Sequence, residues 1–279
     1  MEKALDIDAV IWAGDIFHHK QPARTSHKLV LRAIEAANEY RRLYIVTGNH
    51  DITNDRLESM SQQPLGVLLE GSRAHELDGW VEDLPVAGIP WQQNWMNEGA
   101  VDEAVGRLGT KDFSGKLIVT HAPIYPPATA DEQNWEVLPA FDFVKAMDGT
   151  GSIYYGHIHE DHGIYNVGGT QFCNVGAISR GSLTEYNLSR QVKAALWTPE
   201  DGFFEIDLPA KPAEEVFLIE QASTAKEKQL SNEQFLAEVG KTQLEISSTA
   251  GVIEYISQLT EVEQPVKKIA IELLELQNA

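Results

Sequence analysis

Cysteines, basic side chains and long hydrophobic runs are all scarce in this sequence, and each shortage excludes a class of protein. The single cysteine, Cys173, excludes an internal disulfide framework and is typical of a reducing compartment. No apolar run approaches the roughly 20 residues that span a bilayer, and the N-terminus lacks a basic segment followed by an apolar one. The sequence therefore predicts a cytoplasmic protein that has no membrane among its partners.

Acidic side chains outnumber basic ones by 42 to 22, which gives a formal net charge of -20. Such a balance argues against a broad basic surface for nucleic acid. It does not exclude a local cationic site made by a bound metal ion. The length of 279 residues and the hydrophobic content of 43% suit one large globular domain with an appendage.

Residues 44–51 combine a short β-branched strand with a polar end. The apolar run predicts a buried strand, Gly48 allows a tight exit, and Asn49, His50 and Asp51 follow directly. Taken alone, this pattern is equally typical of a polar turn after a strand. A strand with a polar end recurs three more times, however, before Asp15, before His121, and before His157 and His159. The repetition favours a functional site at which these strand ends converge.

The first two of these strands are separated by a predicted helix that begins at Pro22. A strand, a helix and a strand predict a βαβ unit, so Asp15 and Asn49 are expected at the C-terminal ends of adjacent parallel strands. The other predicted elements are helices over 55–70, 101–108 and 141–147, a strand over 86–91 that leaves the sheet, a lid-like loop over 125–136, and antiparallel strands over 170–174, 191–197 and 203–208.

The composition changes near residues 209–212, which we interpret as a linker. Residues 231–234 form a capping box that predicts a helix start, and amphipathic helices are predicted over 252–259 and from Pro265 onward. The sequence thus predicts a catalytic domain over 1–210 and a helical region over 211–279. That region is either a self-contained bundle or a surface that a partner covers.

The predicted strand ends supply a carboxylate, an amide oxygen and imidazoles, which together suit manganese, iron or zinc. The residues are Asp15, Asn49, His121, His157 and His159. On extended chain, His157 and His159 would project from the same face, and each could serve a different metal of a pair.

The motifs Gly14-Asp15, Gly48-Asn49-His50-Asp51, His121 after a strand, and Gly156-His157-Ile158-His159 resemble those of the calcineurin-like metallophosphoesterases in their order. This resemblance covers roughly residues 8–200 and implies an α/β fold with a two-sheet β core flanked by helices, followed by a small helical region. Residues 14–18 with Pro22, and residues 88–91, further resemble DNA nuclease subunits of the Mre11/SbcD type, above all the phage-encoded enzymes of recombination and repair.

The resemblance implies a role for each residue at a site that holds divalent metals, with manganese expected. Asp15 would bridge two metals, Asn49, His121 and His157 would complete one metal site, and His159 would contribute to the other. His50 would stabilise charge or protonate the leaving oxygen at the scissile phosphate, and Asp51 would orient His50.

One motif of the family has no match in this sequence. The family carries an Asp-x-His motif at the end of a strand that precedes Gly14-Asp15, and nothing upstream of Asp15 corresponds to it. We therefore expect the chain to begin inside the helix that follows that strand. One metal site would then keep only Asp15 and His159, so the chain is expected to hold either one metal or two.

The function indicated is a metal-dependent phosphodiesterase, foremost a DNA exonuclease or endonuclease subunit of a recombination or repair complex. The resemblance implies DNA and a coiled-coil ATPase of the Rad50/SbcC type as partners, and a homodimer is a further possibility. Two alternatives remain open: a catalytically impaired interaction subunit, and a small-molecule phosphodiesterase. A closed pocket capped by residues 125–136 would favour the small substrate, and an open cleft would favour DNA.

Overall fold

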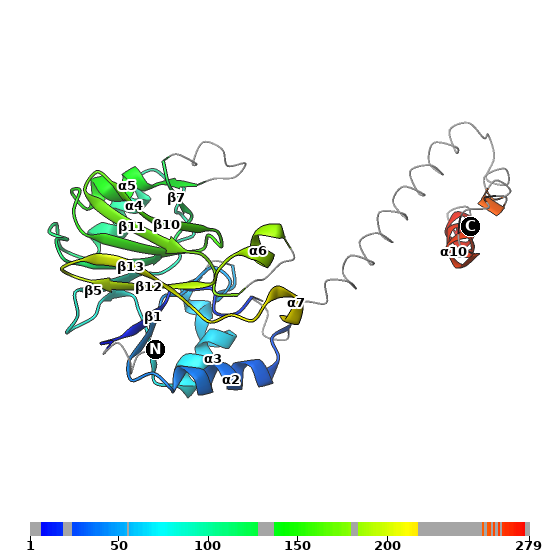
Figure 1. Cartoon of the computed structure of the whole chain (residues 1–279), viewed down its shortest axis with the longest axis horizontal. Coiled ribbons are helices and arrows are strands. Elements are labelled where there is room, and N and C mark those ends of the chain that lie inside the picture. Colours follow the sequence, from blue (N-terminus) through cyan, green and yellow to red (C-terminus); the bar gives the residue numbers. More distant parts are fainter. Residues whose placement is uncertain are drawn as a thin grey trace. The chain divides into compact units, whose positions relative to one another are not determined.

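The chain divides into two compact units, Met1–Ala210 and Lys211–Ala279. The structure is a computed structural model (Figure 1). It describes residues 7–18, 24–54, 56–127, 137–179 and 184–216, and near the C-terminus 253, 256–257, 259, 262 and 264–276.

A three-stranded parallel sheet opens the first unit. Its strands, in spatial order, are β1 (Val10–Trp12), β2 (Leu43–Ile45) and β3 (Ala74–Glu76). The parallel pairing of β1 with β2 confirms the predicted adjacency of these two strands. They are connected through α2 (His27–Ala37), whose first turn is capped by the Ser26 hydroxyl accepting from the N–H of Leu29. The predicted helix start at Pro22 lies outside the described residues.

The second sheet has six strands in the order β10-β11-β9-β6-β5-β4. Three neighbouring pairs are parallel, and the two edge strands β10 and β4 run antiparallel to their neighbours. The strands are β4 (Gly79–Trp80), β5 (Val86–Ile89), β6 (Leu117–His121), β9 (Ser152–Gly156), β10 (Asp161–Val167) and β11 (Thr170–Val175).

This pairing corrects two predictions. Strand β5 does not leave the sheet, because it pairs in parallel with β6 from Val86 opposite Leu117 to Ile89 opposite Thr120. Strand β11 is antiparallel only to β10, since it pairs in parallel with β9 on its other side. Strand β6 is buried throughout and begins with the apolar run 117–119, as is typical of a strand covered on both faces.

Shorter elements complete the first unit. The helix predicted over 55–70 is divided into a 3-10 helix, η2 (Leu57–Gln62), and α3 (Pro64–Gly71). The division falls at Gln63, whose extended backbone (φ -105°, ψ 166°) is the conformation favoured before a proline. The remaining elements are α4 (Ala100–Gly106), β7 (Ile124–Tyr125), β8 (Leu138–Pro139), α5 (Ala140–Ala146), α6 (Glu185–Ser189), β12 (Lys193–Thr198) and β13 (Gly202–Asp207).

Alternating side chains along the strands divide the core into layers. On β6, Ile118 faces a cluster shared with α4 and α5, whereas Val119 faces a second cluster that also receives Val46. On β2, Leu43 and Ile45 face a third cluster shared with α2 and α3. Figure 1 accordingly shows α4 and α5 beyond one sheet and α2 and α3 beyond the other. The predicted two-sheet core flanked by helices is confirmed.

The second unit is described by two helices, α7 (Ala213–Val216) and α10 (Gln264–Leu276). Helix α10 carries Pro265 in its first turn, as the sequence predicts. The capping box at 231–234 and residues 128–136 of the predicted lid lie outside the described residues. No helix in the described part of the chain combines the length and the hydrophobicity needed to cross a membrane.

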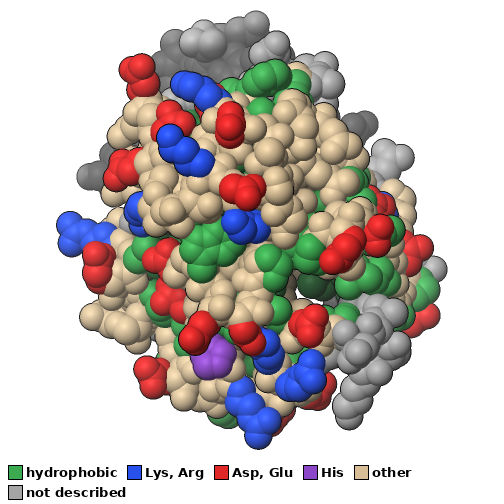
Figure 2. Space-filling view, turned by 90° about the vertical axis from the view of Figure 1, so that its left-hand side faces the viewer, with side chains coloured by type: hydrophobic (Ala, Val, Ile, Leu, Met, Phe, Trp, Pro, Cys, Tyr) green, Lys and Arg blue, Asp and Glu red, His purple; other side chains and the backbone are tan. Residues whose placement is uncertain are grey.

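Figure 2 shows one face of the molecule in space-filling form. Acidic and basic side chains are interspersed on this face, and hydrophobic side chains lie between them. The face therefore offers no continuous basic track for a nucleic-acid backbone, in keeping with the net charge of -20.

Candidate metal centre

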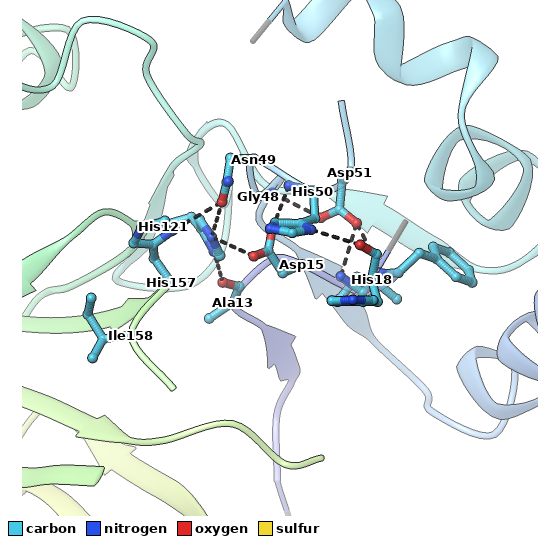
Figure 3. A network of polar contacts seen from close by, with 12 residues as sticks. Ala13, Asp15, His18, Gly48, Asn49, His50, Asp51, His121, His157 and Ile158 are labelled. Carbon is cyan, nitrogen blue, oxygen red and sulfur yellow. Dashed lines mark hydrogen bonds and ion pairs between the residues drawn. The ribbon is translucent and has the colours of Figure 1, made fainter. Parts of the chain in front are cut away.

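Four strands from both sheets deliver polar side chains to one place (Figure 3). Asp15 follows β1, Asn49 follows β2, His121 is the last residue of β6, and His157 comes directly after β9. All four are at C-terminal strand ends, where α/β sheets place their ligands. Parallel pairing places Asp15 beside Asn49 and His121 beside His157, and the packing of the two sheets brings the two pairs together.

The side chains of these four residues point toward a common centre. One ligand atom each from Asp15, His121 and His157 lies within 4.8 Å of the others. The Oδ1 atom of Asn49 lies 3.0 Å from Nδ1 of His157 and 3.2 Å from Nε2 of His121. The predicted convergence of Asp15, Asn49, His121 and His157 is thus present in the structure.

Backbone geometry allows this close approach. Gly14 and Asp15 both have positive φ angles, 91° and 53°, which turn the chain sharply after β1. A Cβ atom at Gly156 would lie 2.2 Å from the carbonyl oxygen of Ala13, so only glycine fits there. The free space lets the Ala13 carbonyl accept a hydrogen bond from Nδ1 of His121 at 2.7 Å.

That hydrogen bond determines which nitrogen of His121 faces the centre. Since Nδ1 carries the proton donated to Ala13, Nε2 of the neutral ring presents a lone pair. Yet Nε2 lies 3.3 Å from Oδ2 of Asp15 and 3.2 Å from Oδ1 of Asn49, both of which are acceptors. Three acceptor atoms that face one another repel unless a proton or a metal cation lies among them. The arrangement therefore fits a divalent cation.

The pKa shifts of Asp15 and His121 also indicate that the site favours a positive charge. Burial alone would raise the pKa of Asp15, but the charge of His121 and hydrogen bonds from His121 and the His50 backbone lower it far below its usual range. Burial would lower the pKa of His121, and the Asp15 carboxylate outweighs that effect and raises it. The Asp15 carboxylate and the His121 imidazole thus each favour the charged form of the other, so the carboxylate attracts a positive charge to this place.

His157 is held as a neutral ligand. Burial, followed by the charge of His121, lowers its pKa to about 4, so its ring is uncharged at neutral pH. The indole of Trp91 covers the ring, with 4.9 Å between ring centroids. One carboxylate, one amide oxygen and two imidazoles form a donor set that suits manganese, zinc or iron.

Comparison with known proteins agrees with this geometry. The family model of the calcineurin-like phosphoesterases matches residues 1–161, more than half of the chain. The chain belongs to this family. No curated protein sequence matches it significantly. Calcineurin-like phosphoesterases are metal-dependent, and the cluster of Asp15, His121 and His157 lies within the matched residues.

In this phosphoesterase, His50 lies beside the candidate metal ligands. Its backbone N–H donates to Oδ1 of Asp15 at 2.8 Å, and Nδ1 of its ring lies 2.8 Å from the carbonyl oxygen of His18. The rings of His18 and His50 are stacked, with 5.6 Å between centroids. The His18 carbonyl therefore fixes the proton on Nδ1 and leaves Nε2 free for another partner.

Asp51 is buried and accepts hydrogen bonds from backbone N–H groups, whereas the resemblance implies that it orients His50. Its Oδ1 accepts from the N–H groups of Ile16 and Phe17, and its Oδ2 accepts from the N–H of Gly48. Among the described residues it makes no hydrogen bond to the imidazole of His50, whose Nδ1 faces the carbonyl oxygen of His18. Asp51 therefore ties the loop after β1 to the loop after β2 and does not orient His50.

His159 lies outside the ligand cluster that the described residues form. The prediction placed it on the same face as His157 because extended chain alternates, but His157 has a φ of 81° and strand β9 ends at Gly156. The alternation argument is therefore wrong for this pair. His159 is exposed at the edge of the site.

Several groups that shape the metal centre of this phosphoesterase are not recognisable from the sequence. The carbonyl oxygens of Ala13 and His18 set the tautomers of two histidines, and main-chain groups leave no mark on residue type. Trp91 resembles any packing residue, yet its ring contacts His157 and lies 6.1 Å from that of His121. Its position two residues after the end of β5, a strand that pairs with β6, is the only signal available.

Proposed function

We propose that this phosphoesterase hydrolyses phosphodiester bonds of DNA as the nuclease subunit of a recombination or repair complex. The observation that supports the chemistry is the convergence of Asp15, Asn49, His121 and His157 beside His50. The choice of DNA rests on the resemblance of residues 14–18 and 88–91 to nucleases of the Mre11/SbcD type.

A divalent metal at this centre, with manganese preferred, would supply positive charge against the charge that develops on the phosphoryl oxygens. Asp15 and Asn49 would hold it through oxygen, and His121 and His157 through nitrogen. The Ala13 carbonyl keeps His121 in the tautomer whose Nε2 is free to bind. Burial keeps His157 uncharged, so its ring does not repel a cation.

His50 is the residue that we assign to proton transfer. Its Nδ1 proton is held by the His18 carbonyl, and its Nε2 is free to carry a second proton. In that charged form the ring can stabilise a phosphate oxygen and donate the Nε2 proton to the leaving oxygen. The backbone N–H of His50 meanwhile fixes Asp15, so one residue serves both the metal ligand and the leaving group.

The acidic composition favours a second candidate, a small-molecule phosphodiesterase. With a net charge of -20, the chain has little intrinsic attraction for a polyanion. For the DNA function, we propose that a coiled-coil ATPase of the Rad50/SbcC type docks on the region 211–279 and supplies DNA affinity. Without such a partner, a small phosphodiester is the easier substrate to bind.

A cleavage assay of the full chain with Mn²⁺ tests the proposal. The substrates are end-labelled duplex DNA, a single-stranded oligonucleotide and bis(p-nitrophenyl) phosphate. We expect cleavage of all three, and a loss of at least a hundredfold in kcat in His50→Gln. The control is His27→Gln, since His27 is exposed at the start of α2 and is not one of the residues assigned to the site.

The outcomes separate the candidate functions. Cleavage of DNA by the unmodified chain and not by His50→Gln supports the nuclease. Hydrolysis of the small diester alone supports the small-molecule phosphodiesterase. A chain that binds Mn²⁺ and cleaves nothing contradicts both enzymatic functions and supports the interaction subunit.

A further inference from the structure

The loop that carries His157 leaves the sheet at a point where main-chain pairing ends. Strands β9 and β11 pair in parallel only as far as Tyr154 opposite Cys173. Strand β9 ends two residues later, at Gly156, and His157 turns the chain with a φ of 81°. The carbonyl groups of Ile158 and His159 therefore cannot join the sheet ladder and need other donors.

The side chain of Asn174 supplies the first of these donors. Asn174 follows Cys173 on β11, and its Nδ2 donates to the carbonyl oxygen of Ile158 at 3.1 Å. Its Oδ1 accepts from the N–H of Gly176 at 2.6 Å. The residue is only 1% exposed, so both ends of a buried amide are used. The amide extends the sheet pairing beyond the last main-chain bond.

The second donor depends on the turn that Asn174 fixes. Gly176 has a φ of 73°, and the turn there brings the N–H of Ala177 within 3.1 Å of the carbonyl oxygen of His159. A Cβ atom at Gly176 would lie 2.7 Å from that same oxygen, which shows how closely the two loops approach. One amide side chain thus organises the hydrogen bonds of both loop carbonyls.

We propose that Asn174 is a positioning residue for the metal centre, acting through the 157–159 loop. It holds the loop so that Nδ1 of His157 lies 3.0 Å from Oδ1 of Asn49. Without it, the buried carbonyl of Ile158 loses its donor, and the loop must move to find another. Such a movement carries His157 away from the other ligands. This inference rests on the proposed metal-dependent function.

A matched pair of substitutions in the full chain tests the proposal. Asn174→Leu keeps the shape of the side chain and removes both hydrogen bonds. Thr170→Val also keeps the shape of the side chain and removes one hydrogen bond at the other end of β11, where the fully buried Thr170 donates to the carbonyl oxygen of Thr150 at 3.3 Å. Each variant removes buried hydrogen bonding from the same strand, and only one of them contacts the loop.

The first measurement is calorimetric titration with Mn²⁺. We expect Asn174→Leu to bind Mn²⁺ about ten- to a hundredfold more weakly than the unmodified chain, and Thr170→Val to bind it unchanged. The second measurement is amide hydrogen exchange of Ala177, whose N–H is bonded to His159. It should be faster in Asn174→Leu alone. Both variants should unfold at a lower temperature, so thermal stability by itself does not separate them.

The proposal would be overturned if Asn174→Leu bound Mn²⁺ as tightly as the unmodified chain. It would also be overturned if Thr170→Val lost as much Mn²⁺ affinity as Asn174→Leu. Unchanged exchange at Ala177 in Asn174→Leu would overturn it as well. If Asn174→Leu fails to fold, the smaller Asn174→Ala decides by the same two measurements. An unmodified chain that binds no Mn²⁺ would instead refute the proposed function, and exchange at Ala177 would then decide the positional role alone.

Discussion

His121 shows how a single residue takes its chemistry from distant parts of the chain. Its Nδ1 bonds to the carbonyl oxygen of Ala13, 108 residues earlier, and its Nε2 faces Asn49, 72 residues earlier. The imidazole type is visible in the sequence, but the tautomer is a product of the fold. The same is true of His50, whose ring is oriented by the carbonyl of His18.

The substitution Gly156→Ala tests whether the site tolerates one additional methyl group. The new Cβ would lie 2.2 Å from the Ala13 oxygen and 3.0 Å from Nδ1 of His121, so either the strand end or the His121 ring must shift. We expect a loss of at least tenfold in Mn²⁺ affinity and about 1–3 kcal/mol of stability. Calorimetric titration and chemical denaturation measure the two effects.

Gly106→Ala is the control for this substitution. Gly106 lies in α4, and a Cβ there meets nothing within 4 Å. We expect it to raise stability by up to about 1 kcal/mol and to leave Mn²⁺ binding unchanged. If Gly156→Ala bound Mn²⁺ as tightly as Gly106→Ala, the close packing of the strand ends would not matter for the site.

Residue types could be predicted at this scale more readily than their contacts. Asp15, Asn49, His121 and His157 stand out because each follows an apolar strand, and the structure brings them together. Asp51 belongs to the same motif, yet its carboxylate bonds to backbone N–H groups. Sequence cannot separate the two cases, because a carboxylate suits either kind of partner.

Strands and their ends are the elements that the sequence predicts best. Strands β2, β6 and β9 are rich in apolar, β-branched and aromatic residues and are largely buried, as is typical of strands covered on both faces. The partners of each strand are harder to predict, since pairing depends on crossovers. Strand β10 escaped prediction because its polar residues and the register shift between Asp161 and Gly163 hide the strand pattern.

Cys173 provides a prediction for strand β11. Burial, followed by the charges of Glu205 and Asp161, raises the pKa of its thiol to about 12 from an ordinary value of 9.0. We expect the native chain at pH 8 to resist Ellman's reagent and the urea-unfolded chain to react fully. Rapid reaction of the native chain would show that β11 is not buried as described.

The raised pKa of Cys173 determines whether the stability of the chain rises or falls with pH. Because the folded chain binds the Cys173 proton more tightly than the unfolded chain, stability falls as pH rises from 9 toward 12. The free energy of unfolding of the unmodified chain, relative to Cys173→Ala, should therefore decrease over that range. Urea denaturation of both chains at pH 8 and pH 10 measures the difference, and no change would contradict the assignment.

At the scale of the whole molecule, the net charge opposes the binding of DNA, whereas the candidate metal site favours it. The net charge of -20 repels a polyanion, whereas a metal centre built from Asp15 and neutral groups attracts a phosphate once it is loaded. The four candidate ligands, Asp15, Asn49, His121 and His157, lie in the unit Met1–Ala210. Contact with DNA by this chain alone should therefore be confined to the few phosphates at the metal.

Salt dependence tests this expectation. Binding of a labelled duplex to His50→Gln with Mn²⁺ should weaken only slightly with added NaCl, with a log–log slope of about -2 or shallower. Fluorescence anisotropy between 50 and 200 mM NaCl, roughly the range over which counterion release is usually followed, gives the slope. A slope as steep as about -6 would reveal many phosphate contacts and refute the idea that the metal provides the main attraction.

The central claim is that Asp15, Asn49, His121 and His157 hold one divalent cation. Anomalous diffraction at the manganese edge from crystals grown with Mn²⁺ tests it most directly. We predict a peak about 2.0–2.3 Å from one ligand atom of each of the four side chains, absent in His121→Gln. A peak elsewhere, or four side chains without a metal among them at saturating Mn²⁺, would contradict the account.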